Sequence, residues 1–247
     1  MGLTLLRQAA ATILAAFALA TPSAVTLWLS TPSTDDVQAR VHALASKYRV
    51  VVLQDHELPP VLVQAIVATE DERFYQHHGV DSLGAARAIL YDITNLCLCQ
   101  GGSTITEQLI KEVYLGGSDR GYNKVVDIVL ALKVERVLTK QQIMADYLSV
   151  ITTGYGKHGM SEAACAYFQA PLGNLSIGQY ALLAGVAQAP SAYDPTVSAE
   201  LARQRRAQVL NAMVSERYIT EDEATAAKAE PVLAVGTHPG SCLGAAA

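Results

Sequence analysis

The chain has 247 residues, of which 51% are hydrophobic, and its formal net charge is −5. This length accommodates one substantial domain, and the hydrophobic content supports a packed core rather than a disordered chain. The absence of a basic excess excludes the usual electrostatic signature of a nucleic-acid-binding protein.

The N-terminal segment contains an uncharged run of 21 residues from Ala9 to Leu29, preceded by Arg7. This run can just span a bilayer as a helix, and Trp28 near its outer end suits a membrane interface. We therefore expect a transmembrane anchor over residues 1–32. A cleaved signal peptide remains the alternative, because Ala18-Leu19-Ala20 resembles a cleavage site. Both interpretations place the rest of the chain on the extracytoplasmic side.

After a linker and lead-in over residues 33–57, apolar periodicity and helix-start signals predict helices in most of the remaining chain. Only Val50–Leu53 could form a short strand, and residues 154–159 are predicted to form a loop. The tail over 229–247 is predicted to be flexible. The sequence thus predicts a mainly α single domain over 58–228. Its expected helices cover residues 61–75, 82–96, 103–116, 124–138, 140–150, 161–168, 176–187 and 198–217.

The four cysteines, Cys97, Cys99, Cys165 and Cys242, show no zinc-ligand spacing. Outside the cytoplasm one disulfide is permitted, and buried free thiols are equally compatible with the sequence. His77 is expected to make structural hydrogen bonds rather than bind a metal, and no dedicated metal site is visible.

Glu70 ends an apolar stretch over residues 61–69 that has the composition of a buried helix. A carboxyl group at the end of such a stretch is partly desolvated, which raises its pKa and suits a general base. The neighbouring Asp71 would raise that pKa further. By spacing alone, however, an acidic helix end without a catalytic role is the favoured interpretation.

Residues 100–108 read Gln-Gly-Gly-Ser-Thr-Ile-Thr-Glu-Gln, a glycine pair that leads into hydroxyl side chains at a helix start. Free backbone amides at a helix N-terminus can hold phosphate oxygens, and Lys111 follows one to two turns later. The alternative requires no ligand, because Thr104 and Glu107 have the spacing of a capping box.

Lys124 and Asp127 lie three residues apart, hence on one face of the helix predicted over 124–138. With Arg120 and Glu135 they form a thin polar stripe on an otherwise apolar helix. Such a stripe is typical of a narrow solvated edge, which is the default, or of the wall of a polar cleft.

The order of these motifs is more specific than any one of them. Glu-Asp-x-x-Phe-x-x-His-x-Gly-x-Asp at 70–81, followed by Gln-Gly-Gly-Ser-Thr-Ile-Thr at 100–106, resembles glycosyltransferase family 51. This is the peptidoglycan glycosyltransferase domain of class A penicillin-binding proteins and of monofunctional transglycosylases. The resemblance continues through 130–135 and 147–148, and it ends with the stretch at 181–195.

The resemblance implies a mainly α, lysozyme-like domain that acts at the cell membrane on lipid II, an undecaprenyl-diphosphate-linked disaccharide pentapeptide. Glu70 would be the base that activates the acceptor 4-hydroxyl, and Asp127 the second catalytic carboxylate. The expected partners are lipid II, the growing glycan chain, the membrane and other cell-wall synthesis proteins, but no nucleic acid. The substrate-binding residues implied are Asp71, Ser103, Thr104, Thr106, Gln108, Lys111 and Lys124.

The resemblance implies no obligatory cofactor, although a divalent cation such as Mg²⁺ or Mn²⁺ could be shared between a carboxylate and the diphosphate. The chain is too short to include a transpeptidase domain beside this one, so we expect a monofunctional enzyme. The apolar stretch from Ala85 to Leu98 is expected either to dip into the outer leaflet, where the lipid resides, or to pack in the core.

The third family motif, Arg-Lys-x-x-Glu, falls on residues 123–127 and departs from the pattern. Asp127 shortens the reach of the carboxylate by one methylene, about 1.5 Å, and Asn123 replaces a cation. Glu107 replaces a glutamine, and Ser149 replaces a common asparagine. These departures leave open a non-catalytic relative that binds lipid II or a cell-wall partner. A lytic enzyme that cuts glycan is a further alternative.

Overall fold

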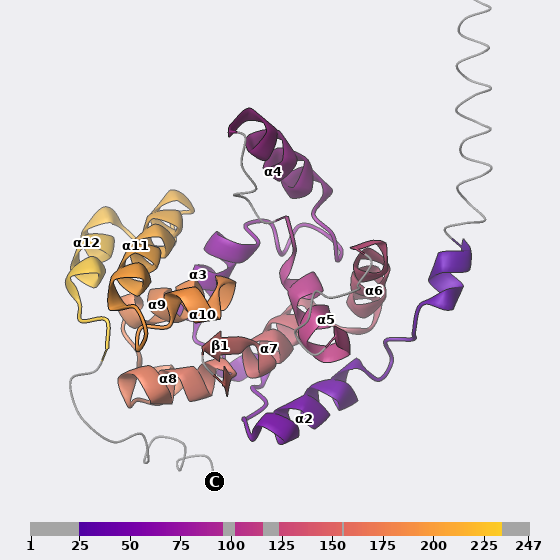
Figure 1. The fold of residues 1–247 in the computed structure, drawn as a ribbon, viewed down its shortest axis with the longest axis horizontal. Helices are drawn as coiled ribbons and strands as arrows, with labels where there is room; N and C mark the ends of the chain where they lie inside the picture. The colour runs from indigo at the N-terminus through magenta and orange to yellow at the C-terminus, as the bar shows by residue number, and fades with distance from the viewer. Residues whose placement is uncertain (1–24, 96–101, 116–123, 155, 234–247) are drawn as a thin grey trace, which may run out of the picture.

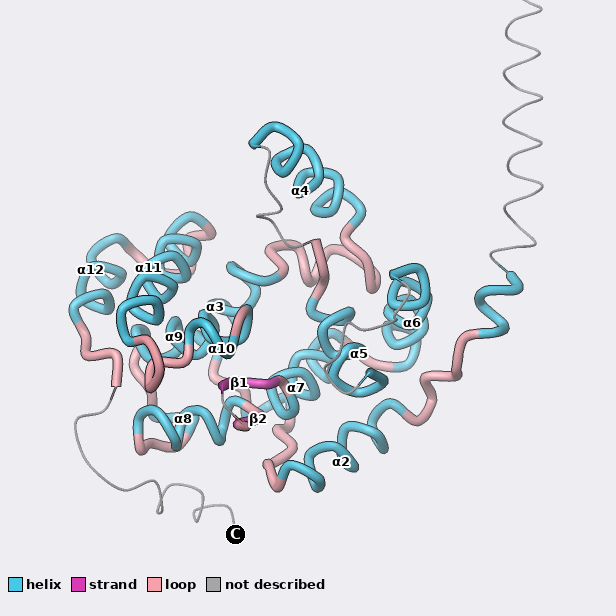
Figure 2. Tube along the Cα trace, in the orientation of Figure 1, coloured by secondary structure: helices cyan, strands magenta, loops and turns pink. Residues whose placement is uncertain are grey.

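The computed structural model describes residues 25–95, 102–115, 124–154 and 156–233. The described chain is mainly helical, which confirms the prediction of a mainly α fold (Figures 1 and 2). A helical turn over residues 25–30 precedes the elements of the domain. These are α2 (Val37–Tyr48), α3 (Pro60–Glu70), α4 (Ser82–Asn95), α5 (Ile105–Leu115), α6 (Lys124–Val137), α7 (Lys140–Val150), β1 (Thr152–Gly154), β2 (Lys157–His158), α8 (Met160–Phe168), α9 (Ile177–Gln188), α10 (Pro190–Tyr193), α11 (Ala199–Ser215) and α12 (Glu221–Ala229), with 3-10 turns at Asp55–Glu57 and Leu172–Asn174.

Local sequence signals set several of these helix starts. Thr139, Ser176 and Thr220 each accept a hydrogen bond from the backbone N–H three residues later. The side chain at that later position accepts a hydrogen bond from the backbone N–H of the hydroxyl residue. These capping boxes provide hydrogen-bond partners for backbone N–H groups at the starts of α7, α9 and α12, which have no partner within the helix. The helices therefore begin where the sequence places hydroxyl residues.

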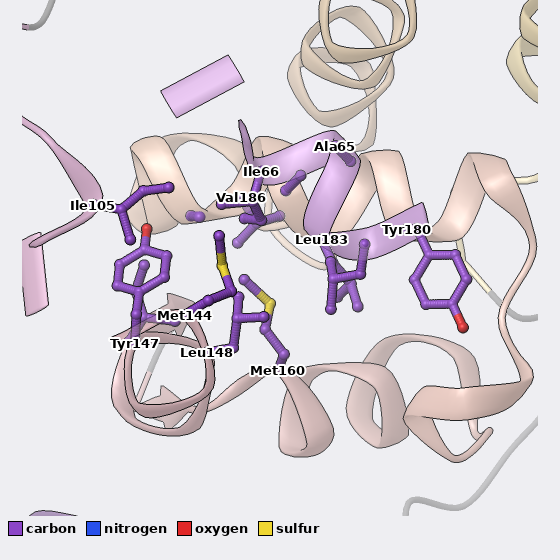
Figure 3. Packing of buried hydrophobic residues seen from close by; sticks show 14 of the residues in the cluster. Ala65, Ile66, Ile105, Met144, Tyr147, Leu148, Met160, Tyr180, Leu183 and Val186 are labelled. Atoms are coloured by element: carbon purple, nitrogen blue, oxygen red, sulfur yellow. The ribbon is translucent and has the colours of Figure 1, made fainter. Parts of the chain in front are cut away.

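The core is centred on α9, which is buried on all sides along most of its length. A helix that is apolar all round is expected in the middle of a domain, and α9 packs against α3, α8, α11 and α12. Figure 3 shows Ile66 of α3 beside Val186 of α9, with Met144 and Leu148 of α7 facing them. This packing holds the C-terminal end of α3, where Glu70 lies, in a fixed position.

Local structure departs from expectation at two places. Val50–Leu53, the segment that could form a short strand, forms none, and the Leu53 N–H donates to the Ser149 hydroxyl at 2.8 Å. The predicted loop at 154–159 is wrong in part, because it overlaps the short antiparallel hairpin β1–β2. Its tight reversal uses Gly154 and Gly156, whose positive φ angles of 143° and 70° strongly favour glycine.

The prediction that one helix continues from residue 61 to 75 is also wrong, since α3 ends at Glu70. Asp71 leaves the helical conformation, with φ −159° and ψ 74°, and the chain turns through residues 72–76. Phe74 is completely buried by this turn. Burial of Phe74 and the bonds of the Asp71 carboxylate, described below, compensate for the lost helical turn.

The predicted N-terminal anchor lies mostly outside the described residues, as does most of the predicted tail. Among the described residues, no helix has the length and hydrophobicity needed to cross a membrane. Cys165 is buried and disulfide-bonded, whereas Cys97, Cys99 and Cys242 lie outside the described residues.

Candidate active site

A cavity of about 930 Å³ lies between the C-terminal end of α3 and helices α4, α5 and α6, and the α7–β1 and α9–α10 junctions complete its wall. Of the nine residues predicted to form the site, eight line this cavity. They are Glu70, Asp71, Ser103, Thr104, Gln108, Lys111, Lys124 and Asp127.

Glu70 is the last residue of α3, and only 7% of its side chain is exposed. The Gln108 amide donates to one carboxylate oxygen at 2.9 Å, and the Arg205 guanidinium lies 3.5 Å from the other. Burial raises the pKa of Glu70 above its ordinary value and outweighs the lowering by Gln108 and Arg205, while the charge of Asp71 adds to the rise. A carboxylate with a raised pKa at the wall of a cavity suits general-base chemistry.

Gln108 is held in one orientation by Tyr147, a fully buried residue of α7. The Tyr147 hydroxyl donates to the amide oxygen of Gln108 at 2.8 Å, so the amide NH₂ must face Glu70. Since α5 and α7 both contribute to this chain of hydrogen bonds, the orientation of Glu70 depends on their packing.

Arg205 and Tyr147 were not among the predicted site residues. Arg205 lies in a charged stretch of α11 far along the chain, and its sequence context resembles a solvated helix face. Tyr147 lies in the stretch 147–148 that belongs to the family resemblance, and this was the sequence signal that could have pointed to a role for Tyr147 in the site. Their contacts with the site arise from the packing of α11 and α7, which spacing along the chain does not reveal.

Asp71 lines the cavity, but its carboxylate is occupied within the protein. It accepts a hydrogen bond from the Ile105 N–H at 3.0 Å and lies 3.0 Å from the Nε2 atom of His77. The expected structural role of His77 agrees with this geometry. Asp71 therefore joins the chain after α3 to the first residue of α5, rather than offering free oxygens to a substrate.

The start of α5 contains the capping box that the sequence offered as an alternative to phosphate binding. The Glu107 carboxylate accepts from the Thr104 N–H at 2.9 Å, and the Thr104 hydroxyl accepts from the Glu107 N–H at 3.2 Å. The Thr104 hydroxyl also donates to the Gly79 carbonyl at 2.7 Å. The amides of Thr104 and Ile105 are thus used internally, and a phosphate would have to be held by side chains.

The prediction that Thr106 contacts substrate is not met, because Thr106 is completely buried and does not line the cavity. Its hydroxyl donates to the Glu135 carboxylate at 2.6 Å, and Lys140 donates to the same oxygen at 2.7 Å. On α5, Thr106 points away from the face that carries Gln108. Its role is to connect α5 with α6 and α7.

Ser103, Lys111 and Lys124 remain as side chains able to bind a phosphate. Lys124 lies on α6 and donates to the Ser103 hydroxyl and to the Glu107 carboxylate, each at 3.1 Å. Asp127 follows one turn later on α6 and lines the same cavity. The two basic side chains and the hydroxyl therefore border the part of the cavity formed by α5 and α6.

The cavity wall carries more negative than positive charge. Its carboxylates are Glu70, Asp71, Glu72, Asp81, Glu107, Glu112 and Asp127, whereas its cations are Arg87, Lys111 and Lys124. Several of these carboxylates have a cationic partner within the protein: Glu70 pairs with Arg205, Glu72 with Arg87, Asp81 with Arg73 and Glu107 with Lys124. Among the described residues, no group of three or more His, Cys, Asp or Glu side chains is arranged to hold a metal ion.

A protein-family model described as Transglycosylase matches residues 37–214. The chain belongs to the transglycosylase family. Membership makes this chain a peptidoglycan glycosyltransferase domain at the level of the family, in agreement with the resemblance seen in the sequence motifs.

The transglycosylase domain is 42% identical over 185 residues to penicillin-binding protein 1A of Vibrio cholerae. The aligned region covers 75% of this chain and 22% of that protein. It is 38% identical over 186 residues to penicillin-binding protein 1A of Escherichia coli, with coverages of 75% and 22%. A crystal structure of penicillin-binding protein 1A from Haemophilus influenzae matches with a TM-score of 0.46 and 23% identity, over 76% of this chain and 19% of that chain. The chain spans about a fifth of the length of these relatives.

Proposed function

We propose that the transglycosylase domain polymerises lipid II into glycan strands and releases undecaprenyl diphosphate. The observation that carries this proposal is Glu70, a buried carboxylate with a raised pKa that faces a polar cavity also lined by Lys111 and Lys124. Family membership supplies the reaction class, and the geometry of the cavity supports the choice of residues.

In the proposed step, Glu70 takes the proton from the 4-hydroxyl of the acceptor sugar. The oxygen attacks the anomeric carbon of the growing chain, a new glycosidic bond forms, and the bond from that carbon to the lipid diphosphate breaks. The leaving group departs with the bonding electrons, so the charge lost from Glu70 on protonation appears on the diphosphate. Gln108 and Arg205 orient the Glu70 carboxylate during the proton transfer.

The leaving diphosphate needs positive charge, and we propose that Lys111, Lys124 and the Ser103 hydroxyl, which border the α5–α6 part of the cavity, bind it. Because carboxylates outnumber cations on the wall, we propose that a cavity carboxylate such as Asp127 would hold Mg²⁺ or Mn²⁺, and that the ion would supply positive charge to the leaving diphosphate. Such an ion would arrive with the substrate, since the described residues offer no preformed metal site.

The lipid part of the substrate requires the domain to work at a membrane, and α4 supports this location. Leu83, Leu90 and Ile93 are each about two-thirds exposed along this helix. In Figure 1, α4 projects from the rest of the domain. A helix with exposed large apolar side chains is typical of a membrane-surface contact. We propose that the domain lies on the extracytoplasmic side, held by the N-terminal anchor, where other cell-wall synthesis proteins can join it.

The direct test incubates the full chain, in detergent, with fluorescently labelled lipid II and Mg²⁺, and separates the products by gel electrophoresis. Wild-type protein should form glycan polymer, and Glu70→Gln should lower the rate by about 10²–10⁴-fold, the usual contribution of a general base. Glu57→Gln, at an exposed position outside the cavity, is the matched control and should polymerise normally.

The same experiment addresses the non-catalytic alternative raised by Asp127 and Asn123. Measurable binding of lipid II without polymer under any condition would overturn the enzymatic proposal and favour a binding protein. Release of soluble fragments from purified sacculi, without a need for lipid II, would instead indicate a lytic enzyme.

A further inference from the structure

The N-terminal segment meets the domain at the C-terminal half of α6. The Trp28 ring lies 4.4 Å from the Arg136 guanidinium carbon and 5.1 Å from the Lys133 ammonium nitrogen. Lys133 also donates to the carbonyl oxygens of Thr31 and Pro32, at 2.9 and 3.1 Å. We call this contact of residues 28–32 with Lys133 and Arg136 the α6 joint.

The α6 joint carries positive charge that the domain leaves uncompensated. Within the described ranges, neither Lys133 nor Arg136 forms an ion pair with a carboxylate. The nearby Lys140 is neutralised by Glu135. Two cations therefore remain beside an aromatic ring, at the point where the predicted membrane segment reaches the domain.

A hollow of about 420 Å³ adjoins the joint and is lined by Arg136, Lys140, Thr139 and His77, among others. His77 is only 8% exposed, and its buried Nδ1 atom has no hydrogen-bond partner. The Nε2 atom lies 3.0 Å from both oxygens of the Asp71 carboxylate, so Nδ1 is the ring nitrogen left without a partner. A buried polar atom without a partner is costly, so the hollow fits a ligand that brings a hydroxyl group.

Apolar side chains surround the cations of the joint. Val25 and Leu29 are exposed on the N-terminal turn, and Leu132 and Val137 are exposed on α6. Cations next to tryptophan and exposed aliphatic side chains are typical of a membrane interface, where lipid headgroups meet acyl chains.

We propose that the α6 joint and the adjoining hollow bind the headgroup of an anionic phospholipid that carries hydroxyl groups, such as a phosphoglycerol headgroup. The phosphate lies against Arg136 and Lys133, and a headgroup hydroxyl forms a hydrogen bond with Nδ1 of His77. The acyl chains lie along Leu29 and Val137. This inference rests on the proposed membrane location of the domain, and it adds a lipid site separate from the catalytic cavity.

Trp28 is the only tryptophan in the chain, so its fluorescence reports on this site directly. The full-length protein is placed in nanodiscs of phosphatidylcholine that contain a headgroup-proximal quencher, attached either to phosphatidylglycerol or to phosphatidylcholine. We expect the phosphatidylglycerol quencher to be about fivefold more effective, the factor that one basic residue contributes near an anionic surface. Arg136→Gln should abolish this preference, so that the two quenchers become about equally effective.

Arg203→Gln on α11 is the matched control, because it removes an equal charge from an exposed site on a different element and should keep the preference. Polymerisation in detergent should be the same for Arg136→Gln and wild type, since Arg136 does not line the catalytic cavity. Soluble glycerol phosphate should not reduce the preference. Reduction by this competitor would show a site for free oxyanions and overturn the assignment to lipid.

Equal quenching by both lipids in the wild-type protein would overturn the inference even if the protein enters nanodiscs and polymerises lipid II. A protein that does not enter nanodiscs would instead contradict the membrane location on which the inference rests. The two failures are therefore distinguishable.

Discussion

At the scale of single residues, Glu70 is governed by opposing influences. Burial raises its pKa, whereas the hydrogen bond from Gln108 and the charge of Arg205 lower it. The carboxylate is thus basic enough to take a proton, and its orientation is fixed by contacts from α5 and α11. Arg205 itself is packed beside Tyr193, with its guanidinium 5.8 Å from the ring centre.

Replacement of Arg205 by glutamine should move the acidic limb of the kcat/KM profile to higher pH. The reason is that loss of the cation removes one of the two influences that keep the pKa of Glu70 down. The measurement is the initial rate of lipid II polymerisation as a function of pH.

Arg206→Gln is the matched control for this change. Arg206 is buried next in sequence but donates to the backbone carbonyls of Lys228, Glu230 and Pro231. Its loss should lower the thermal stability without moving the pH profile. An unchanged profile for Arg205→Gln would show that Arg205 does not influence the base.

Asp127 should tolerate restoration of the longer side chain. Asp127→Glu extends the carboxylate into the cavity that Asp127 already lines, so we expect the polymerisation rate to stay equal or to rise. Misplacement of about 1 Å at a catalytic group can cost about 100-fold. A loss of that size in Asp127→Glu would show that the cavity is built around aspartate.

At the scale of elements, α5, α6 and α7 meet at one buried ion pair. Glu135 of α6 is 5% exposed and binds both Lys140 of α7 and Thr106 of α5. α5 presents Gln108 and α6 presents Asp127 to the cavity, so this ion pair fixes the relative position of two parts of the site without contacting it.

Glu135→Gln should lower the free energy of unfolding by about 3 kcal/mol, because the largely buried Lys140 would lose its counter-charge. The midpoint of thermal unfolding, measured by circular dichroism, is expected to fall on the order of 10 °C. Glu200→Gln breaks an exposed pair with Arg203 and should cost less than about 1 kcal/mol. Equal effects of the two changes would contradict the importance of burial.

The sequence predicted the elements better than it predicted the contacts between them. Helix starts such as those of α7 and α9 follow from hydroxyl caps that are visible in the chain. The end of α3 was missed because it depends on the hydrogen bond that the Ile105 N–H donates to the Asp71 carboxylate, a contact between distant residues. Thr106 was assigned to the site by the family resemblance. Only the helix packing decides which side chain of α5 faces the cavity.

At the scale of the whole molecule, α4 exposes several large apolar side chains. Leu90 and Ile93 are 64% and 66% exposed. Leu90→Ser combined with Ile93→Ser should leave the thermal midpoint unchanged, since little buried surface is lost. Lower kcat/KM for lipid II in vesicles, by at least about tenfold, is expected if both side chains enter the membrane.

Val197→Ser with Leu201→Ser is the control for this change, because it removes similar exposed aliphatic groups at the start of α11. Figure 2 shows α11 and α4 as separate helices. Equal losses for both double variants would point to a general effect on solubility rather than to membrane contact by α4.

The position of Glu70 at the C-terminal end of α3 has a cost for the folded state. The negative end of the helix dipole and the surrounding apolar side chains both disfavour the ionised carboxylate. Because the folded-state pKa is raised, this group stabilises the fold fully below its ordinary pKa of about 4.5, and that contribution is lost as pH rises through the folded value. The form of the enzyme that is ready to react is thus the less stable form, a trade-off between stability and activity confined to one side chain.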